Sequence, residues 1–204
     1  MLRAPAGTAL ALLLVTAPVT ADEVFTIDRA HSEISFRIRH MMSKVSGTFG
    51  DFEGTIDLSR EQPEQSNVEF RIKAASIDTN NDRRDTHLRS ADFFDVEQHP
   101  EIVFRSTRIV PKGENAFEVH GDFTMRGVTK AIVVPVTYLG EMKDARGRTK
   151  AGWEASAMLN RKDYGIVWNQ TLDTGGFVLG DEVEVSINLQ AAKQEAAAAG
   201  TATR

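Results

Sequence analysis

The chain has 204 residues, a formal net charge of −5 at pH 7 and no cysteine. The absence of cysteine excludes disulfide bonds, thiol catalysis and thiolate metal sites. A mildly acidic chain without a basic block argues against nucleic acid as a partner and against electrostatic binding to an anionic membrane. The length suffices for one domain whose stability comes from its core.

The first 21 residues read as a cleaved secretory signal peptide. Arg3 precedes an apolar run from Ala9 to Val15, and Val19-Thr20-Ala21 places small residues where a signal peptidase cleaves. The run is too short to span a bilayer, which makes an uncleaved anchor the weaker alternative. We therefore expect an exported chain, with no stable membrane insertion of the part that follows.

Residues 22–192 carry the alternation of polar and apolar side chains that is typical of β-strands. The clearest segments with this period begin at Ile34, Val68, Phe117, Ile132 and Val183. Short turns rich in glycine separate them, which favours antiparallel connections. Strands with one apolar face must stack or close on themselves, and closure removes exposed edges. The sequence therefore predicts an all-β fold, an antiparallel barrel of about eight strands.

A long second strand is expected over residues 44–58. It contains three glycines, Gly47, Gly50 and Gly54. Glycine inside a strand suits the sharp bends or bulges of a small barrel. We therefore expect one strand that bends at these positions.

Helix is expected mainly in one connection, over residues 80–90. Thr79 and Asp82 have the spacing of a capping box. Residues 91–94 add one more turn, and Pro100 ends the segment before the next strand. One or two short helices are therefore expected to cap the barrel.

The chain after residue 160 offers two weaker signals. Residues 162–167 favour a second short helical turn. The tail 193–204 is rich in alanine and has no apolar face, so we expect it to be disordered.

Phe93 and Phe94 are the most unusual feature of the connecting segment 85–104. The two rings stand between Asp92 and Asp95 in a stretch that is polar at both ends. Large apolar rings in a charged connection must bury against something, or they leave an exposed patch. On a barrel, we expect this pair to plug or line one end of the lumen and to be the gate for ligand entry.

The histidines do not form a metal site in the sequence. His31 and His40 lie at opposite ends of one strand, about 30 Å apart if the strand stays extended, so they cannot share an ion. His40 could meet His87 or His99, but no ligand spacing supports this. For His31, a hydrogen bond to a neighbour such as Asp28 is the simpler interpretation.

No catalytic motif stands out either. The sequence contains no GxSxG, SxxK or HExxH motif and no glycine-rich phosphate loop. An enzyme acting on a small amphiphile, with His31 or His40 as the general base, is the alternative to a binding protein.

The interior of the predicted barrel is strongly apolar, with 11 phenylalanines against two tyrosines. A small barrel can fill its lumen with such side chains, or it can leave a slot for one long apolar ligand. The sequence alone leaves both interpretations open. The phenylalanines at positions expected to face inward are Phe36, Phe49, Phe52, Phe93, Phe94, Phe104 and Phe123.

Six blocks of the sequence, taken in order, resemble the YceI-like family of exported lipid-binding proteins. The similarity runs from about Val24 to Leu189, and the order of several blocks makes it specific. The blocks are Asp28-x-x-His31-Ser32 followed by Phe36 and His40; Val45-x-Gly47-x-Phe49-x-x-Phe52-x-Gly54; Asp85-x-His87-Leu88-Arg89-Ser90-x-Asp92-Phe93-Phe94; Pro100-x-Ile102-x-Phe104; Thr124 to Lys130; and Asn160 to Ile166.

The resemblance implies a lipocalin-like barrel in the bacterial periplasm that binds or carries a polyisoprenoid or another long-chain amphiphile. It implies no cofactor beyond that lipid and no catalysis, and it does not define which lipid is bound. Whether two copies pair as a homodimer stays open. His40 is the candidate for contact with a polar head group, with a backbone-bonded residue at the mouth as the alternative. The ligand-binding residues expected on this basis are Phe36, Ile38, His40, Phe49, Phe52, Phe93, Phe94, Phe104 and Phe123.

Overall fold

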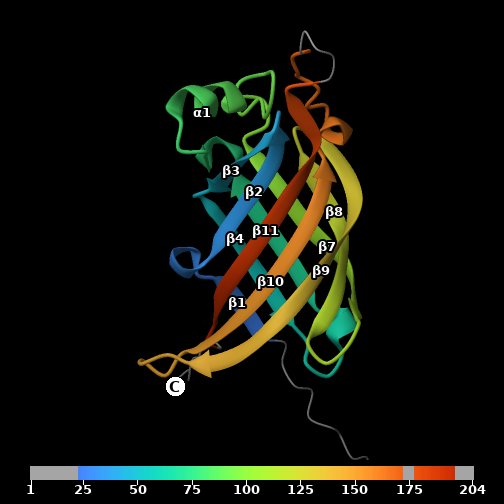
Figure 1. Ribbon diagram of the computed structural model, residues 1–204. Coiled ribbons are helices and arrows are strands. Elements are labelled where there is room, and N and C mark those ends of the chain that lie inside the picture. Colours follow the sequence, from blue (N-terminus) through green and yellow to red (C-terminus); the bar gives the residue numbers. More distant parts are fainter. Residues whose placement is uncertain (1–22, 172–176, 196–204) are drawn as a thin grey trace, which may run out of the picture.

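The strands form one antiparallel sheet that closes into a tall barrel, seen from the side in Figure 1. The computed structural model describes residues 23–171 and 177–195. Closure occurs at β1, which pairs with β4 on one side and with β11 on the other. The strands are β1 (Glu23–Ile27), β2 (Glu33–His40), β3 (Ser43–Phe49), β4 (Phe52–Leu58), β5 (Asn67–Lys73), β6 (Ile77–Asp78), β7 (Glu101–Pro111), β8 (Ala116–Met125), β9 (Val128–Lys143), β10 (Thr149–Asn160) and β11 (Leu179–Lys193).

The closed ring has eight strands, β1-β4-β5-β7-β8-β9-β10-β11, and this confirms the predicted antiparallel barrel. The strands β2, β3 and β6 continue this wall at one end, where β2 pairs with β11 beyond the point at which β1 leaves it. The 3-10 helix η1 (Arg29–His31) separates β1 from β2, and η3 (Ala74–Ser76) separates β5 from β6. Segments that follow each other in the sequence, such as β1 and β2, therefore lie end to end along the same neighbouring strand, β11.

The single strand expected over residues 44–58 is wrong, because β3 ends at Phe49 and β4 begins at Phe52. Gly50 and Asp51 leave the ladder and bond to the end of β5 and to the connection that follows it. The Gly50 N–H donates to the Ser76 carbonyl at 3.2 Å, and the Lys73 N–H donates to the Asp51 carbonyl at 2.9 Å. The break lets β3 pair with β2 and β6, while β4 pairs with β1 and β5.

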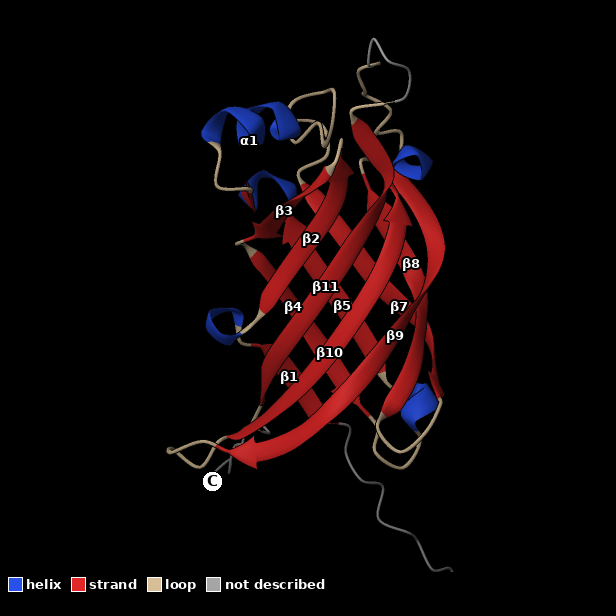
Figure 2. Cartoon of the chain, in the orientation of Figure 1, coloured by secondary structure: helices blue, strands red, loops and turns tan. Residues whose placement is uncertain are grey.

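Helix α1 (Asp82–Arg89) lies over one end of the barrel, the upper end in Figure 2. Its N-cap is Asn81, whose side chain accepts from the Arg84 N–H at 3.0 Å. The capping box expected from Thr79 and Asp82 is therefore wrong. Asn81 takes the N-cap position because its short side chain already accepts a hydrogen bond from the third helical N–H.

Two arginines fasten the segments around this end. The Arg126 guanidinium donates to the carbonyl oxygens of Ala91 and Gly165, which lie on separate connections. The expected turn over residues 162–167 is present as the 3-10 helix η4 (Arg161–Tyr164), and Gly165 ends it in the left-handed region with φ 73°. Arg161 is almost fully buried there.

An apolar cluster packs into the opposite half of the barrel. Phe25 and Trp153 pack edge-on with ring centroids 5.6 Å apart, and Ile56, Ala151 and Ala191 surround them. Trp153 and Ile56 of this cluster also line the cavity described below, so the cluster narrows the lumen without closing it. No helix within residues 23–171 and 177–195 is long and apolar enough to cross a bilayer.

The structure covers only part of what the sequence predicts for the two ends of the chain. The signal peptide expected over residues 1–21 lies outside the described residues. Strand β11 extends through Lys193, which pairs with Phe25, so the barrel ends one residue later than expected. The rest of the expected tail lies outside the described residues from position 196 onward.

Candidate functional site

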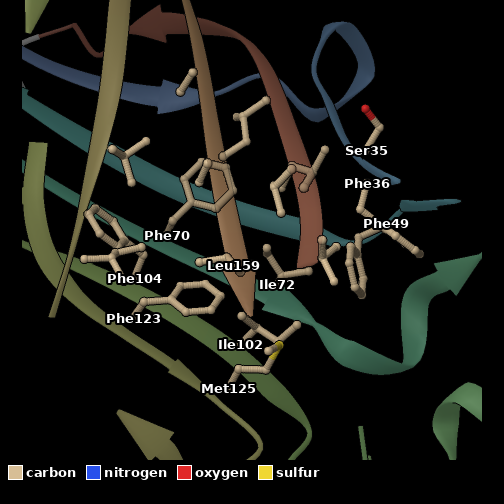
Figure 3. Close-up of a pocket in the computed structure, with 18 of the residues that line it drawn as sticks. Ser35, Phe36, Phe49, Phe70, Ile72, Ile102, Phe104, Phe123, Met125 and Leu159 are labelled. Carbon is tan, nitrogen blue, oxygen red and sulfur yellow. The ribbon is translucent and has the colours of Figure 1, made fainter. Parts of the chain in front are cut away.

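A cavity of about 950 Å³ runs through the barrel. This volume lies at the upper end of the range for ligand pockets. Its wall consists mainly of the inward-facing side chains of the strands, and Figure 3 shows part of this lining. The rings of Phe70, Phe104 and Phe123 come from β5, β7 and β8 and point into the same space. The lumen is therefore a slot and not a filled core.

The glycines of the barrel explain why so many phenylalanines leave a cavity. Gly47 stands directly across from Phe36, and a Cβ atom at Gly47 would lie 2.5 Å from the ring's Cζ. Gly54 stands across from Phe70 in the same way, with 2.8 Å to Cδ2. Each ring folds back onto a glycine instead of crossing the lumen. The sequence predicts bends at these glycines and does not reveal their role in the cavity.

The structure brings together all but one of the nine expected ligand-binding residues. Phe52 is the exception: it is buried against Phe70, with ring centroids 5.8 Å apart, and does not line the cavity. It sits where β4 begins after the break at Gly50, so its ring supports the wall from the side. The residues that line the cavity are Phe36, Ile38, His40, Phe49, Phe93, Phe94, Phe104 and Phe123.

Phe93 and Phe94 line the cavity beside α1, where they are expected to plug or line one end of the lumen. Phe94 packs edge-on against Phe49 of β3, with centroids 5.8 Å apart. Phe93 is buried between His87 and Trp168. Its ring centroid lies 5.0 Å from that of His87 and 5.2 Å from that of Trp168. The two rings thus face different walls. Their proposed movement as a gate stays a prediction.

Cationic side chains border the same end. Arg83 and Arg84 line the cavity, together with His40 and Asn81. Arg84 is held in place, because its Nε and Nη2 donate to the hydroxyl and the carbonyl oxygen of Thr79, each at 2.7 Å. Among the ion pairs of the described residues, neither arginine has a carboxylate partner. This end of the cavity therefore suits a neutral or anionic group.

The histidines fall into different settings. His31 is 65% exposed, bonds to Asp28 at 3.1 Å and lies outside the cavity wall. His40 lines the cavity, but in the described part of the chain no carboxylate orients its ring. His87, which the sequence suggests only as a possible partner of His40, also lines the cavity and bonds to Asp92 at 2.8 Å. Within the described ranges, no three metal-ligating side chains gather into a site.

Residues 25–191 match the sequence model of the YceI-like domain, which spans the barrel from β1 to β11. The chain belongs to the YceI-like family. A UPF0312 protein of Azotobacter vinelandii is 39% identical over 157 residues, which cover 76% of this chain and 82% of the relative. A UPF0312 protein of Photorhabdus laumondii is 42% identical over 159 residues, which cover 77% and 82% of the two chains.

Several solved structures share the barrel. BcnA of Burkholderia cenocepacia superimposes with a TM-score of 0.72 at 23% identity, covering 80% of this chain and 98% of BcnA. The Campylobacter jejuni YceI protein gives 0.67 at 24% identity, covering 93% and 100%. A domain of Saccharophagus degradans, described as polyisoprenoid-binding, gives 0.62 at 14% identity, covering 83% and 98%. These likenesses show a lipocalin-like fold.

Proposed function

We propose that the protein is a periplasmic binding and carrier protein that holds a polyisoprenoid or another long-chain amphiphilic lipid in the barrel cavity, without catalysis. The continuous apolar cavity of about 950 Å³ carries this proposal. Burying a chain in it is favourable by about 0.8 kcal/mol for each CH₂ group, so few polar contacts are needed for tight binding. The polyisoprenoid-binding description of the Saccharophagus degradans neighbour supports the ligand class.

The polar head group belongs at the α1 end, in this proposal. His40, Asn81 and Arg84 line that end, and Phe93 and Phe94 stand beside them. The apolar chain then extends along the phenylalanine wall toward the middle of the barrel. The signal-peptide pattern of residues 1–21 supports export to the periplasm, where a lipid needs a protein to cross water.

Mass spectrometry of the protein purified from its native periplasm tests the proposal. The denatured protein is extracted with organic solvent, and a stoichiometric long-chain lipid is expected in the extract. An extract without such a lipid contradicts the carrier. The purified lipid should also come back unchanged after long incubation with the protein, since catalysis would alter its mass.

Two neighbouring positions of β10 provide a matched pair of variants. Ala157 faces the cavity, and Ser156 faces outward, because adjacent strand residues point to opposite sides. Ala157→Trp fills the lumen and should abolish lipid uptake, while Ser156→Trp adds the same ring outside and should leave uptake unchanged. Equal uptake by both variants would place the lipid outside the barrel and contradict the proposal.

A further inference from the structure

The cavity has a second, polar end that lies away from α1. Ser59, Arg60, Ser66, Asn115 and Tyr138 line it there. They come from the connection between β4 and β5, the hairpin between β7 and β8, and strand β9. In Figure 1 this is the lower end, where the turn between β9 and β10 also lies. An apolar lumen thus runs from one polar border to another.

Arg60 joins parts of the wall that are not hydrogen-bonded neighbours. Its Nε and Nη2 donate to Glu23 Oε2 at 2.9 and 2.7 Å, and Nη2 also donates to Glu141. Glu23 begins β1, whereas Glu141 belongs to β9, and strands β10 and β11 lie between them in the ring. The guanidinium therefore links two separated strands at the border of the lumen. We call Arg60, Glu23 and Glu141 the Arg60 bridge.

The Arg60 bridge borders apolar structure on its inner side. Tyr138, which lines the cavity next to it, packs on Trp153 with ring centroids 5.6 Å apart. Trp153 in turn belongs to the cluster around Phe25 and also lines the cavity. The hydrogen bond from Arg60 holds the pKa of Glu23 below its ordinary value, so the carboxylate is charged at neutral pH. An apolar chain that reached this layer would meet a partly exposed cation held by two carboxylates, where it gains no apolar contact and can pass only by breaking their hydrogen bonds.

We propose that the Arg60 bridge is the stop that sets the longest chain the cavity accepts. This inference rests on the proposed function and adds the residue that determines chain-length specificity. A chain entering from the α1 end gains contact with the wall for each CH₂ group until its tip meets the bridge. A longer chain gains nothing further, because its additional groups would either break the ion pairs or remain outside in water.

A series of straight-chain alcohols of increasing length tests the stop by competition with a fluorescent fatty acid. In the wild-type protein the affinity should rise about fourfold for each CH₂ group and then level off at one length. Arg60→Ala should move this break to longer alcohols by at least two CH₂ groups, which is about a tenfold or larger gain for those alcohols. Shorter alcohols should bind the variant and the wild type equally.

Two further variants separate the bridge from general effects. Glu141→Gln removes half of the bridge and should move the break in the same direction, which covers a folding failure of Arg60→Ala. Arg146→Ala removes an equal charge in the turn between β9 and β10, outside the cavity wall, and should leave the break in place. A break at the same length in all four proteins overturns the stop alone. A wild-type protein that binds no alcohol of the series overturns both the stop and the proposed function.

Discussion

The buried carboxylate of Asp85 accepts hydrogen bonds from both the backbone N–H and the hydroxyl group of Thr79, the N–H at 3.0 Å. Asp85 lies in α1, and Thr79 directly follows β6, so the pair fastens the helix to the last strand segment before it. Both residues are nearly inaccessible, with 4% of each exposed. The same Thr79 hydroxyl also accepts from Arg84, which orients that cation toward the cavity.

Asp85→Ala should therefore loosen α1 as a unit. It leaves the buried N–H of Thr79 without an acceptor, which costs about 1–3 kcal/mol of the free energy of unfolding. Urea denaturation measures this loss, and hydrogen exchange should show faster exchange over residues 82–94. Thr86→Ala in the same helix removes only an exposed hydroxyl that bonds to the Asp82 carbonyl, and it should change neither. Protection of α1 equal to that of the wild type would rule out this fastening.

Gly47→Ala should disturb the cavity wall. The added Cβ would come within 2.5 Å of the Phe36 ring and 2.7 Å of the Thr79 methyl group, so the ring must swing into the lumen. We expect a loss of about 1–3 kcal/mol in stability, and weaker lipid binding. Gly50→Ala is the control, because its added Cβ would lie 4.0 Å from the Ser76 carbonyl oxygen, at an ordinary van der Waals distance. Equal lipid binding by the two variants would contradict the role of Gly47.

The strands of the barrel can be predicted from local patterns in the sequence, but the breaks between them cannot. Period-two alternation predicts inward and outward faces wherever a strand has one side against the core, as at Ile34, Phe36 and Ile38. The break at Gly50 and Asp51 depends on backbone partners near Ser76, more than 20 residues later. A glycine in a strand pattern does not reveal a hydrogen-bond partner so far along the chain, so the sequence predicts one bent strand.

The candidate site, too, could be predicted from the sequence only in part. Inward-facing phenylalanines could be identified from the alternation and from the resemblance to the family, and most of them line the cavity. Whether they fill the lumen could not be decided, since this depends on the register that sets Phe36 against Gly47. The contact of Arg60 with Glu141 spans 81 residues, and it has no signature in the sequence.

Acid should weaken the joint between β1 and β2 through Asp28. A hydrogen bond from Lys150 at 2.7 Å lowers the pKa of the Asp28 carboxyl from 3.8 to about 2. A depressed pKa contributes stability above the unfolded value, near pH 4, and the contribution is lost as the pH falls to 2. Because the pair is partly exposed, we expect about 1–2 kcal/mol. Asp28→Asn should be less stable than the wild type by this amount at pH 7 and equally stable near pH 2.

Urea denaturation between pH 7 and pH 2 measures this difference for Asp28→Asn. Glu33→Gln is the control, because Glu33 is exposed and forms no ion pair with the described residues. Its stability should follow that of the wild type at every pH. A gap between Asp28→Asn and the wild type that stays constant down to pH 2 would show that the carboxylate's charge does not stabilise this joint.

Arg161 should be essential for the order of the segment that precedes β11. Its guanidinium is 3% exposed and donates to the carbonyl oxygens of Ile166, Trp168 and Gly180, each at 2.8 Å. Arg161→Met removes these donors together with the pairing to Asp181, and we expect a loss of about 3 kcal/mol. Because Trp168 lines the cavity beside Phe93, its fluorescence emission should shift to longer wavelength.

The emission change is measured in a Trp153→Phe background, since the sequence has only two tryptophans. Lys162→Met is the matched control: it removes a cation that pairs with the same Asp181 at 2.8 Å, but on the exposed side. Surface pairs of this kind contribute about 0–1 kcal/mol, so this variant should keep both the emission of Trp168 and most of the stability. If the two variants lost equal stability with unchanged emission, the pairing with Asp181 would matter and the carbonyl contacts of Arg161 would not.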